Sequence, residues 1–321
     1  MKIAVIENEF GQENIDHEIL VQDTREQIVE MSNGCICCTV RGDLIVALGN
    51  LIARRNAGEI DFERVVIETT GLANPGPVAQ TFFMDEDVGT SYLLDGVITV
   101  IDASNAMQQL DSFEEAQRQA GFADRMLLSK TDLVSEDALA VLETRLRRIN
   151  PLAPLGRADF GRSPIDEIFD IRGFNLNDKL EIDPDFLKAE ETHHDCDDHC
   201  DHHHHHDHGH HQQKDDHHHG HHTDGIAAFV FRSEKPFDPA KLEDFIGHLI
   251  QVYGPRMLRY KGILWMQGAS RKVIFQGVHQ TMGSDLGAPW GESESRGSKI
   301  VFIGQALPRE IFIEGLRQCL V

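Results

Sequence analysis

The sequence is 321 residues long, which is enough to bury a large hydrophobic core and predicts about two domains. Its formal net charge of −23 would repel nucleic acids and anionic membranes, so neither is expected as a partner. Six cysteines in a chain of this length do not indicate a disulfide scaffold, and no apolar run predicts a membrane span or a signal peptide. A soluble protein of the reducing cytoplasm is therefore expected.

Short apolar runs alternate with helical patterns through the first half of the chain. Residues 2–6, 65–67, 97–101 and 126–128 form short, mainly apolar runs, and each run stops at polar residues. Leucines and isoleucines at helical spacing form a stripe over residues 139–149. Strands of this kind, separated by helices, predict an α/β fold with a parallel sheet covered on both faces.

Polar residues follow each predicted strand, at the edge where parallel sheets gather functional groups. The alternative is that polar residues end every strand without a shared function. That alternative explains each position taken singly, but it explains the whole set less well. The residues concerned are Glu7, Glu9, Glu68, Asp102, Lys130 and Asp132.

Three cysteines lie within four residues, at Cys35, Cys37 and Cys38, ahead of a segment whose leucines have helical spacing. Three thiols at one turn form a soft, potentially anionic pocket that suits Zn²⁺ or a similar thiophilic ion. A redox pair, or buried cysteines acting as small apolar groups, are the alternatives. Buried cysteines would be expected singly within apolar runs, whereas polar residues and a glycine surround these three.

Residues 193–222 contain 16 histidines, 7 aspartates and 2 cysteines, which predicts a disordered metal-binding tract. Imidazole binds Zn²⁺, Ni²⁺ or Cu²⁺ readily. A solvated linker with incidental histidines is one alternative, and an internal purification tag is another, although aspartate, cysteine and glycine interrupt the tract irregularly. The auxiliary metal ligands proposed from this tract are Cys196, His199, Cys200, His202, His203, His204, His205 and His206.

The pattern from Ile226 onward predicts a small α+β domain. It consists of a strand, a helix that opens at Asp238-Pro239, three further strands and a last helix that opens at Pro308. His248 and His279 are interpreted as structural residues, because no chemical motif surrounds them.

Four motifs together resemble the CobW/YjiA family of metal-chaperone GTPases, in order and in spacing. They are Glu7-Asn8-Glu9-Phe10-Gly11, Gly34-Cys35-Ile36-Cys37-Cys38, Glu68-Thr69-Thr70-Gly71 and Ser129-Lys130-Thr131-Asp132. The C-terminal part is similar to the C-terminal domain of that family, in which a histidine-rich insert is familiar. The resemblance implies a GTPase-like domain over 1–170, a linker over 171–225 and a C-terminal domain over 226–321.

By this resemblance, Ser129, Lys130 and Asp132 bind the guanine base, although the family more often has asparagine where Ser129 stands. The Asp132 carboxylate would accept hydrogen bonds from the guanine N1–H and amine, while the Lys130 stem packs over the base. Glu68 would be the catalytic residue beside Mg²⁺ and the phosphates, and Gly71 would let the backbone approach the γ-phosphate. A surface ion pair between Lys130 and Asp132 is the alternative for that motif.

The sequence departs from the family at its start. The family begins with a strand and a phosphate-binding loop, Gly-x-x-x-x-Gly-Lys-Thr, whereas no glycine is followed by lysine in this chain. We expect that the sequence begins at an internal methionine of a longer protein, lacking the first strand of a P-loop GTPase-like sheet. Both neighbours of that strand would expose their backbone edges, and this chain would bind GTP weakly and hydrolyse it poorly.

The function implied by the resemblance is that of a zinc chaperone. Zn²⁺, with Co²⁺ or Ni²⁺ as other candidates, would pass from Cys35, Cys37 and Cys38 to a client metalloprotein, coupled to GTP and Mg²⁺. A non-catalytic metal-binding or storage protein and a nickel-insertion accessory GTPase are the alternatives.

Overall fold

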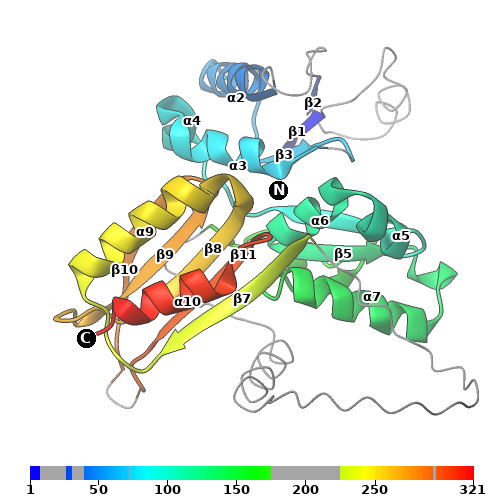
Figure 1. Ribbon diagram of the computed structural model, residues 1–321. Helices are drawn as coiled ribbons and strands as arrows, with labels where there is room; N and C mark the ends of the chain where they lie inside the picture. The colour runs from blue at the N-terminus through cyan, green and yellow to red at the C-terminus, as the bar shows by residue number, and fades with distance from the viewer. Residues whose placement is uncertain (8–26, 31–39, 72, 175–224, 292–293) are drawn as a thin grey trace, which may run out of the picture.

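The computed structural model describes residues 1–7, 27–30, 40–71, 73–174, 225–291 and 294–321. Two parallel sheets with their helices are followed by an antiparallel C-terminal sheet, which α9 and α10 cover on one face (Figure 1). This confirms the predicted α/β region followed by a smaller α+β region. Cys35, Cys37 and Cys38 and the histidine tract lie outside the described residues.

The first parallel sheet has the strand order β2-β1-β3. Its elements are β1 (Ile3–Glu7), β2 (Gln27–Glu30), α2 (Val40–Asn56), β3 (Arg64–Glu68), α3 (Pro75–Met84) and α4 (Glu86–Ser91). Leu44, Leu48 and Leu51 form one face of α2, and they are buried in the same core as Ala4 and Ile6 of β1. Helical spacing after the cysteines therefore predicted this helix correctly.

The second parallel sheet has the order β4-β5-β6. Its elements are β4 (Ile98–Asp102), α5 (Ala106–Ser112), α6 (Glu114–Phe122), β5 (Arg125–Ser129), the 3-10 turn η1 (Thr131–Leu133), α7 (Glu136–Ile149), β6 (Leu155–Arg157) and the 3-10 turn η2 (Ile165–Glu167). The predicted apolar stripe of α7, which comprises Leu139, Leu142, Leu146 and Ile149, is buried throughout. Ser135 caps this helix by accepting a hydrogen bond from the Ala138 N–H.

The two parallel sheets do not join edge to edge. β3 and β4 are each the outermost strand of their sheet, and neither has a second strand partner among the described residues. Their central side chains are correspondingly open, with Val66 of β3 38% exposed and Val100 of β4 66% exposed. The expected pair of unpaired backbone edges is therefore present. Arg64, at the start of β3, connects the sheets through ion pairs to Asp170 at 2.6 Å and to Asp95, ahead of β4, at 3.6 Å.

The C-terminal sheet has the order β10-β9-β8-β11-β7, and every pairing in it is antiparallel. Its elements are β7 (Ile226–Ser233), α9 (Pro239–Tyr253), the 3-10 turn η3 (Gly254–Arg256), β8 (Met257–Leu264), β9 (Arg271–Val278), β10 (Thr281–Pro289), β11 (Ser298–Gln305) and α10 (Arg309–Gln318). Phe229 and Phe231 of β7 lie in the core beneath α9 and α10, whereas Val230 lies in the core shared with α6 and α7.

One sequence expectation about the C-terminal sheet was wrong. The structure has four strands after α9 rather than three, because β10 is a polar, glycine-containing edge strand without an apolar run. In the first parallel sheet, Pro75 and Pro77 both lie in the first turn of α3. Proline is tolerated there because the first N–H groups of a helix have no intrahelical partner.

The C-terminal sheet is held to the second parallel sheet by a buried ion pair. The side chains of Arg259 in β8 and Asp124 before β5 are each 5% exposed and contact one another. Arg259 also donates to the backbone carbonyls of Phe122 at 3.2 Å and Gly173 at 2.7 Å. Its guanidinium lies 4.5 Å from the centre of the Phe174 ring.

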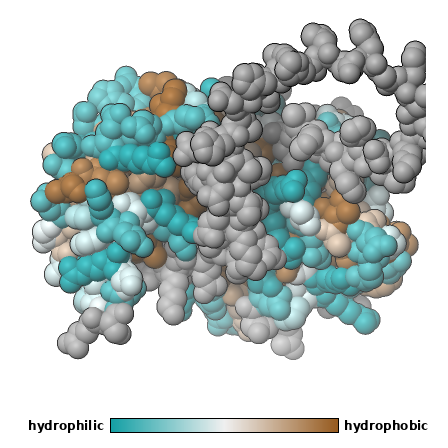
Figure 2. Space-filling view, turned by 60° about the horizontal axis from the view of Figure 1, so that its bottom comes forward, coloured by the Kyte–Doolittle hydropathy of each residue, from teal (hydrophilic) through white to brown (hydrophobic). Residues whose placement is uncertain are grey.

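None of the described helices is both long and apolar enough to cross a membrane. Figure 2 shows one face of the molecule, on which hydrophobic residues form separate patches among hydrophilic ones.

Candidate functional site

The carboxyl ends of β4 and β5 bring the predicted polar residues together. Asp102 ends β4 and lies in parallel register with Ser129, which ends β5. The next residue, Lys130, extends its ammonium back to Asp102, with Nζ 2.7 Å from the Asp102 Oδ2. Lys130 therefore pairs with Asp102 rather than with Asp132, so the simple surface pair considered from the sequence is not the arrangement observed.

Asp102 is the centre of a small hydrogen-bond network. Besides Lys130, it accepts hydrogen bonds from the Ser104 hydroxyl at 2.6 Å, the Ser104 N–H at 3.0 Å and the Asn105 amide at 3.0 Å. These donors, led by Lys130, hold the pKa of the Asp102 carboxyl well below its ordinary value. Asp102 is consequently ionised at any pH at which the protein would work, and it fixes the position of the lysine ammonium.

Lys130 is one of the few non-glycine residues with a left-handed backbone, at φ 56°. This conformation turns the chain sharply from β5 into the turn Thr131–Leu133. Thr131 is held in place by Asp159, which follows β6 and accepts from the Thr131 N–H at 3.0 Å and from its hydroxyl at 2.8 and 2.9 Å. Those hydrogen bonds lower the pKa of the Asp159 carboxyl. The two residues that precede Asp132, Lys130 and Thr131, are thus fixed by carboxylates.

Asp132 itself is exposed, and no hydrogen bond or ion pair forms on its carboxylate within the described residues. A fixed backbone with a free carboxylate suits recognition of paired N–H donors, such as those on one edge of guanine. Sequence reasoning missed Asp159, because β6 is only three residues long and gave no apolar run to mark its end.

Glu68 and Gly71 lie at the carboxyl end of the first sheet. Parallel register places Glu7 beside both Glu68 and Glu30, so three strand ends with acidic residues share this edge. Gln119 of α6 fixes the loop that follows β3, because its amide donates to the Gly71 carbonyl at 3.1 Å and to the Ala73 carbonyl at 2.9 Å. No atom of the described residues lies within 4 Å of where a Cβ on Gly71 would be, so a ligand could approach the backbone there.

The structure places the two ends of the cysteine segment but not the cysteines. β2 ends at Glu30 on the carboxyl edge of the first sheet, and α2 begins at Val40. Within the described residues, no three His, Cys, Asp or Glu side chains are grouped so as to hold a metal ion. The remaining cysteine of the described chain, Cys319, is buried at the end of α10 in the C-terminal core.

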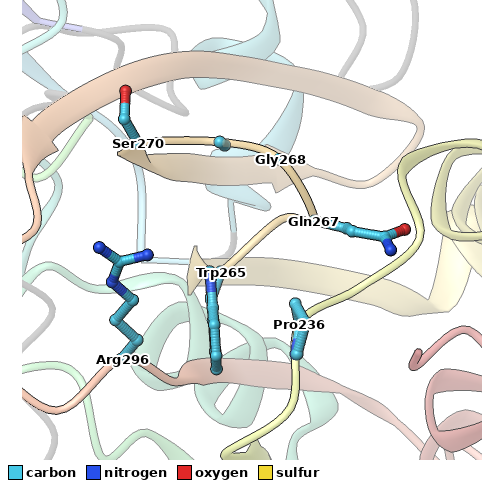
Figure 3. A pocket seen from close by; sticks show the side chains of 7 residues that line it. Pro236, Trp265, Gln267, Gly268, Ser270 and Arg296 are labelled. Carbon is cyan, nitrogen blue, oxygen red and sulfur yellow. The ribbon is translucent and has the colours of Figure 1, made fainter.

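A hollow of about 440 Å³ lies on the C-terminal sheet and contains none of the predicted site residues. Pro236, Trp265 and Arg296 lie around it, together with the turn that begins at Gln267 (Figure 3). It is therefore separate from the strand ends described above.

Known proteins are similar to this chain over most of its length. A family model of the CobW/HypB/UreG nucleotide-binding domain matches residues 1–156, and one of the cobalamin synthesis protein cobW C-terminal domain matches residues 226–320. The zinc chaperone YjiA of Escherichia coli is 37% identical over 310 residues, an alignment that covers 96% of this chain and 87% of that protein. The zinc chaperone CobW of Pseudomonas aeruginosa is 30% identical over 350 residues, covering 99% and 84%.

A eukaryotic relative and a solved structure are also similar. The zinc-regulated GTPase metalloprotein activator 1 of Schizosaccharomyces pombe is 34% identical over 206 residues, covering 61% of this chain and 48% of that protein. The crystal structure of the Zn(II)-bound YjiA GTPase from E. coli matches with a TM-score of 0.75. The two chains are 30% identical in the structural alignment, which covers 100% of this chain and 90% of the YjiA chain.

Proposed function

The chain belongs to the CobW/HypB/UreG family of nucleotide-binding proteins with a CobW C-terminal domain, and on this premise we propose that it is a zinc chaperone controlled by guanine nucleotide. The observation that carries the proposal is the turn Lys130–Asp132. Two carboxylates, Asp102 and Asp159, fix its lysine and its threonine and leave the Asp132 carboxylate exposed.

Base recognition rests on Ser129, Lys130 and Asp132. Asp132 accepts hydrogen bonds from the guanine N1–H and exocyclic amine, which adenine does not present in that pattern. The aliphatic stem of Lys130 packs over the base, while its ammonium stays on Asp102. Ser129 anchors the start of the turn, since its hydroxyl donates to the Ile101 carbonyl at 3.2 Å.

The phosphate side of the site is assigned to the loop after β3. Glu68 acts beside Mg²⁺ and the phosphates, and the open backbone at Gly71 receives the γ-phosphate.

The cargo is Zn²⁺, bound by Cys35, Cys37 and Cys38 as thiolates, with water or a client ligand completing a tetrahedron. The strand that precedes the cysteine segment supports coupling to the nucleotide. Its last residue, Glu30, and Glu68 are both in register with Glu7, so the cysteine segment and the β3 loop start from the same sheet edge. A nucleotide-driven shift of the β3 loop would change the geometry of the thiolates, and a client metalloprotein would then receive the metal.

Residues 193–222 supply auxiliary, weaker sites within a linker over 171–225, between a GTPase-like region over 1–170 and a C-terminal domain over 226–321. The linker starts and ends on the folded protein, which supports a local role. The Gln276 amide donates to the Phe174 carbonyl at 2.6 Å, and the Ile226 N–H donates to the Gln117 amide oxygen at 3.2 Å. Metal bound to a tether fixed at both ends stays at high local concentration near the thiolates.

The test is anaerobic transfer of Zn²⁺ from the loaded protein to a chelating dye, with GDP, GTP or ATP present. We expect transfer rates that differ between GDP and GTP, no effect of ATP, and loss of the difference in Asp132→Ala. Tight Zn²⁺ binding with one transfer rate under all nucleotides would instead establish a metal-binding or storage protein.

A further inference from the structure

Phe160 is an exposed aromatic residue in a strained backbone conformation. It follows Asp159 and has φ 53°, and Gly161 after it has φ 71°. The Arg162 N–H donates to the Asp159 carbonyl at 3.0 Å, which closes a four-residue turn whose two central residues are both left-handed. Such turns strongly favour glycine, asparagine and aspartate at these positions, and a bulky side chain there is a true outlier.

Burial against the described residues does not offset this strain at Phe160. The residue is 86% exposed, so almost none of its ring is removed from water. Backbone strain without a compensating contact occurs at sites where a ligand completes the environment. The exposed ring therefore points to a bound ligand, and its position in the fold indicates the kind of ligand.

The strained turn is bonded directly to the guanine-binding turn. Asp159, next to Phe160, accepts hydrogen bonds from the N–H and the hydroxyl of Thr131, and Thr131 lies between Lys130 and Asp132. Lys130 is itself left-handed, so two strained residues meet at the carboxyl ends of β5 and β6. A flat hydrophobic ring and the long stem of Lys130 are the two kinds of surface that hold a planar base.

We propose that Phe160 stacks on the purine base that Asp132 recognises, so that the base lies between this ring and the stem of Lys130. The proposal rests on the guanine-nucleotide function given above and adds a base-contacting residue to it. Phe160 then contributes to affinity for any purine nucleotide, while Asp132 selects guanine over adenine.

The proposal makes an unusual prediction for Phe160→Gly. Glycine adopts a positive φ without strain, so this variant should melt at a higher temperature than the wild type. It should also bind GDP about tenfold more weakly, because base–aromatic stacking is lost. Phe160→Ala should bind as weakly without the gain in stability. Phe113→Ala is the matched control, since Phe113 is an exposed phenylalanine of the same region with φ −128°.

GDP binding would be measured on the full chain by equilibrium dialysis, up to millimolar GDP, and by saturation-transfer NMR on the base H8 proton. We expect weaker binding and a lost H8 signal in both Phe160 variants, and no change in Phe113→Ala. In Phe160→Trp we expect retained affinity with indole fluorescence quenched by GDP. Wild-type affinity in Phe160→Gly would overturn the stacking proposal and leave the nucleotide function standing. Absence of GDP binding by the wild type would overturn both.

Discussion

Removal of the Arg259 side chain should destabilise the protein more than any other single arginine change in the C-terminal sheet. In Arg259→Met, the Asp124 carboxylate stays buried but loses its ion-pair partner. Among the described residues, it still accepts a hydrogen bond from the Val97 N–H at 2.8 Å. The carbonyls of Phe122 and Gly173 lose a charged donor as well. Loss of one partner of a buried ion pair costs about 3–5 kcal/mol, because the other charge is left in a medium of low polarity.

This loss would be measured by urea unfolding of Arg259→Met beside Arg296→Met, which removes an exposed arginine just before β11. We expect a lower midpoint at unchanged slope, and a melting temperature lower by on the order of 10 °C, whereas Arg296→Met should shift little. The double variant Asp124→Leu with Arg259→Met should recover part of the loss, since no charge is then left unpaired. A loss below about 1 kcal/mol in Arg259→Met would refute the reasoning, because such values belong to solvated pairs.

Three further outcomes are expected. Burial, aided by the positive charge of Arg118, lowers the pKa of His279. The imidazole of His279 therefore takes up a proton more readily in the unfolded chain than in the folded protein. Stability should therefore fall as pH drops below about 6.5, and less so in His279→Asn, as urea midpoints at several pH values would show. Gly76→Ala places a Cβ 2.5 Å from the His279 Nε2 and should lower the free energy of unfolding by about 1–3 kcal/mol. Its control is Gly49→Ala in α2, where no described atom lies within 4 Å of the new Cβ. This control should raise the free energy of unfolding by about 0.5–1 kcal/mol in the same denaturation assay. Deletion of 193–222 should lower the total Zn²⁺ bound in equilibrium dialysis and leave the tightest site intact. Loss of the tightest site would reverse the proposed division of roles.

The regular elements were predictable because their patterns depend on local spacing. Leu139 and Leu146 of α7 lie on one helical face, and both are buried as the spacing predicted. The run 126–128 likewise marked β5, and Asp102 and Ser129 met at one edge because parallel strands end together. These features need only the period of the element and the direction of the sheet.

Other features depend on long-range partners and left no mark in the local sequence. The hydrogen bonds between Asp159 and Thr131 require the short strand β6 to lie beside β5, and three residues give too little pattern to predict it. The strain at Phe160 is a property of backbone angles, although a phenylalanine followed by glycine after a strand is a weak signal of a turn. β10 was missed because an edge strand needs hydrogen bonds from one neighbour and little apolar surface.

The most direct test of a thiolate-held metal cargo is anaerobic titration with Co²⁺ under reducing conditions, followed by absorption spectroscopy. The wild type and the control Cys319→Ala, which removes a thiol buried in the C-terminal core, should both develop an intense sulfur-to-cobalt charge-transfer band. Cys35→Ser and Cys37→Ser should weaken that band and lose the tight site. A wild type without the band, or cysteine variants with unchanged tight-site stoichiometry, would contradict the assignment of Cys35, Cys37 and Cys38 as the metal site.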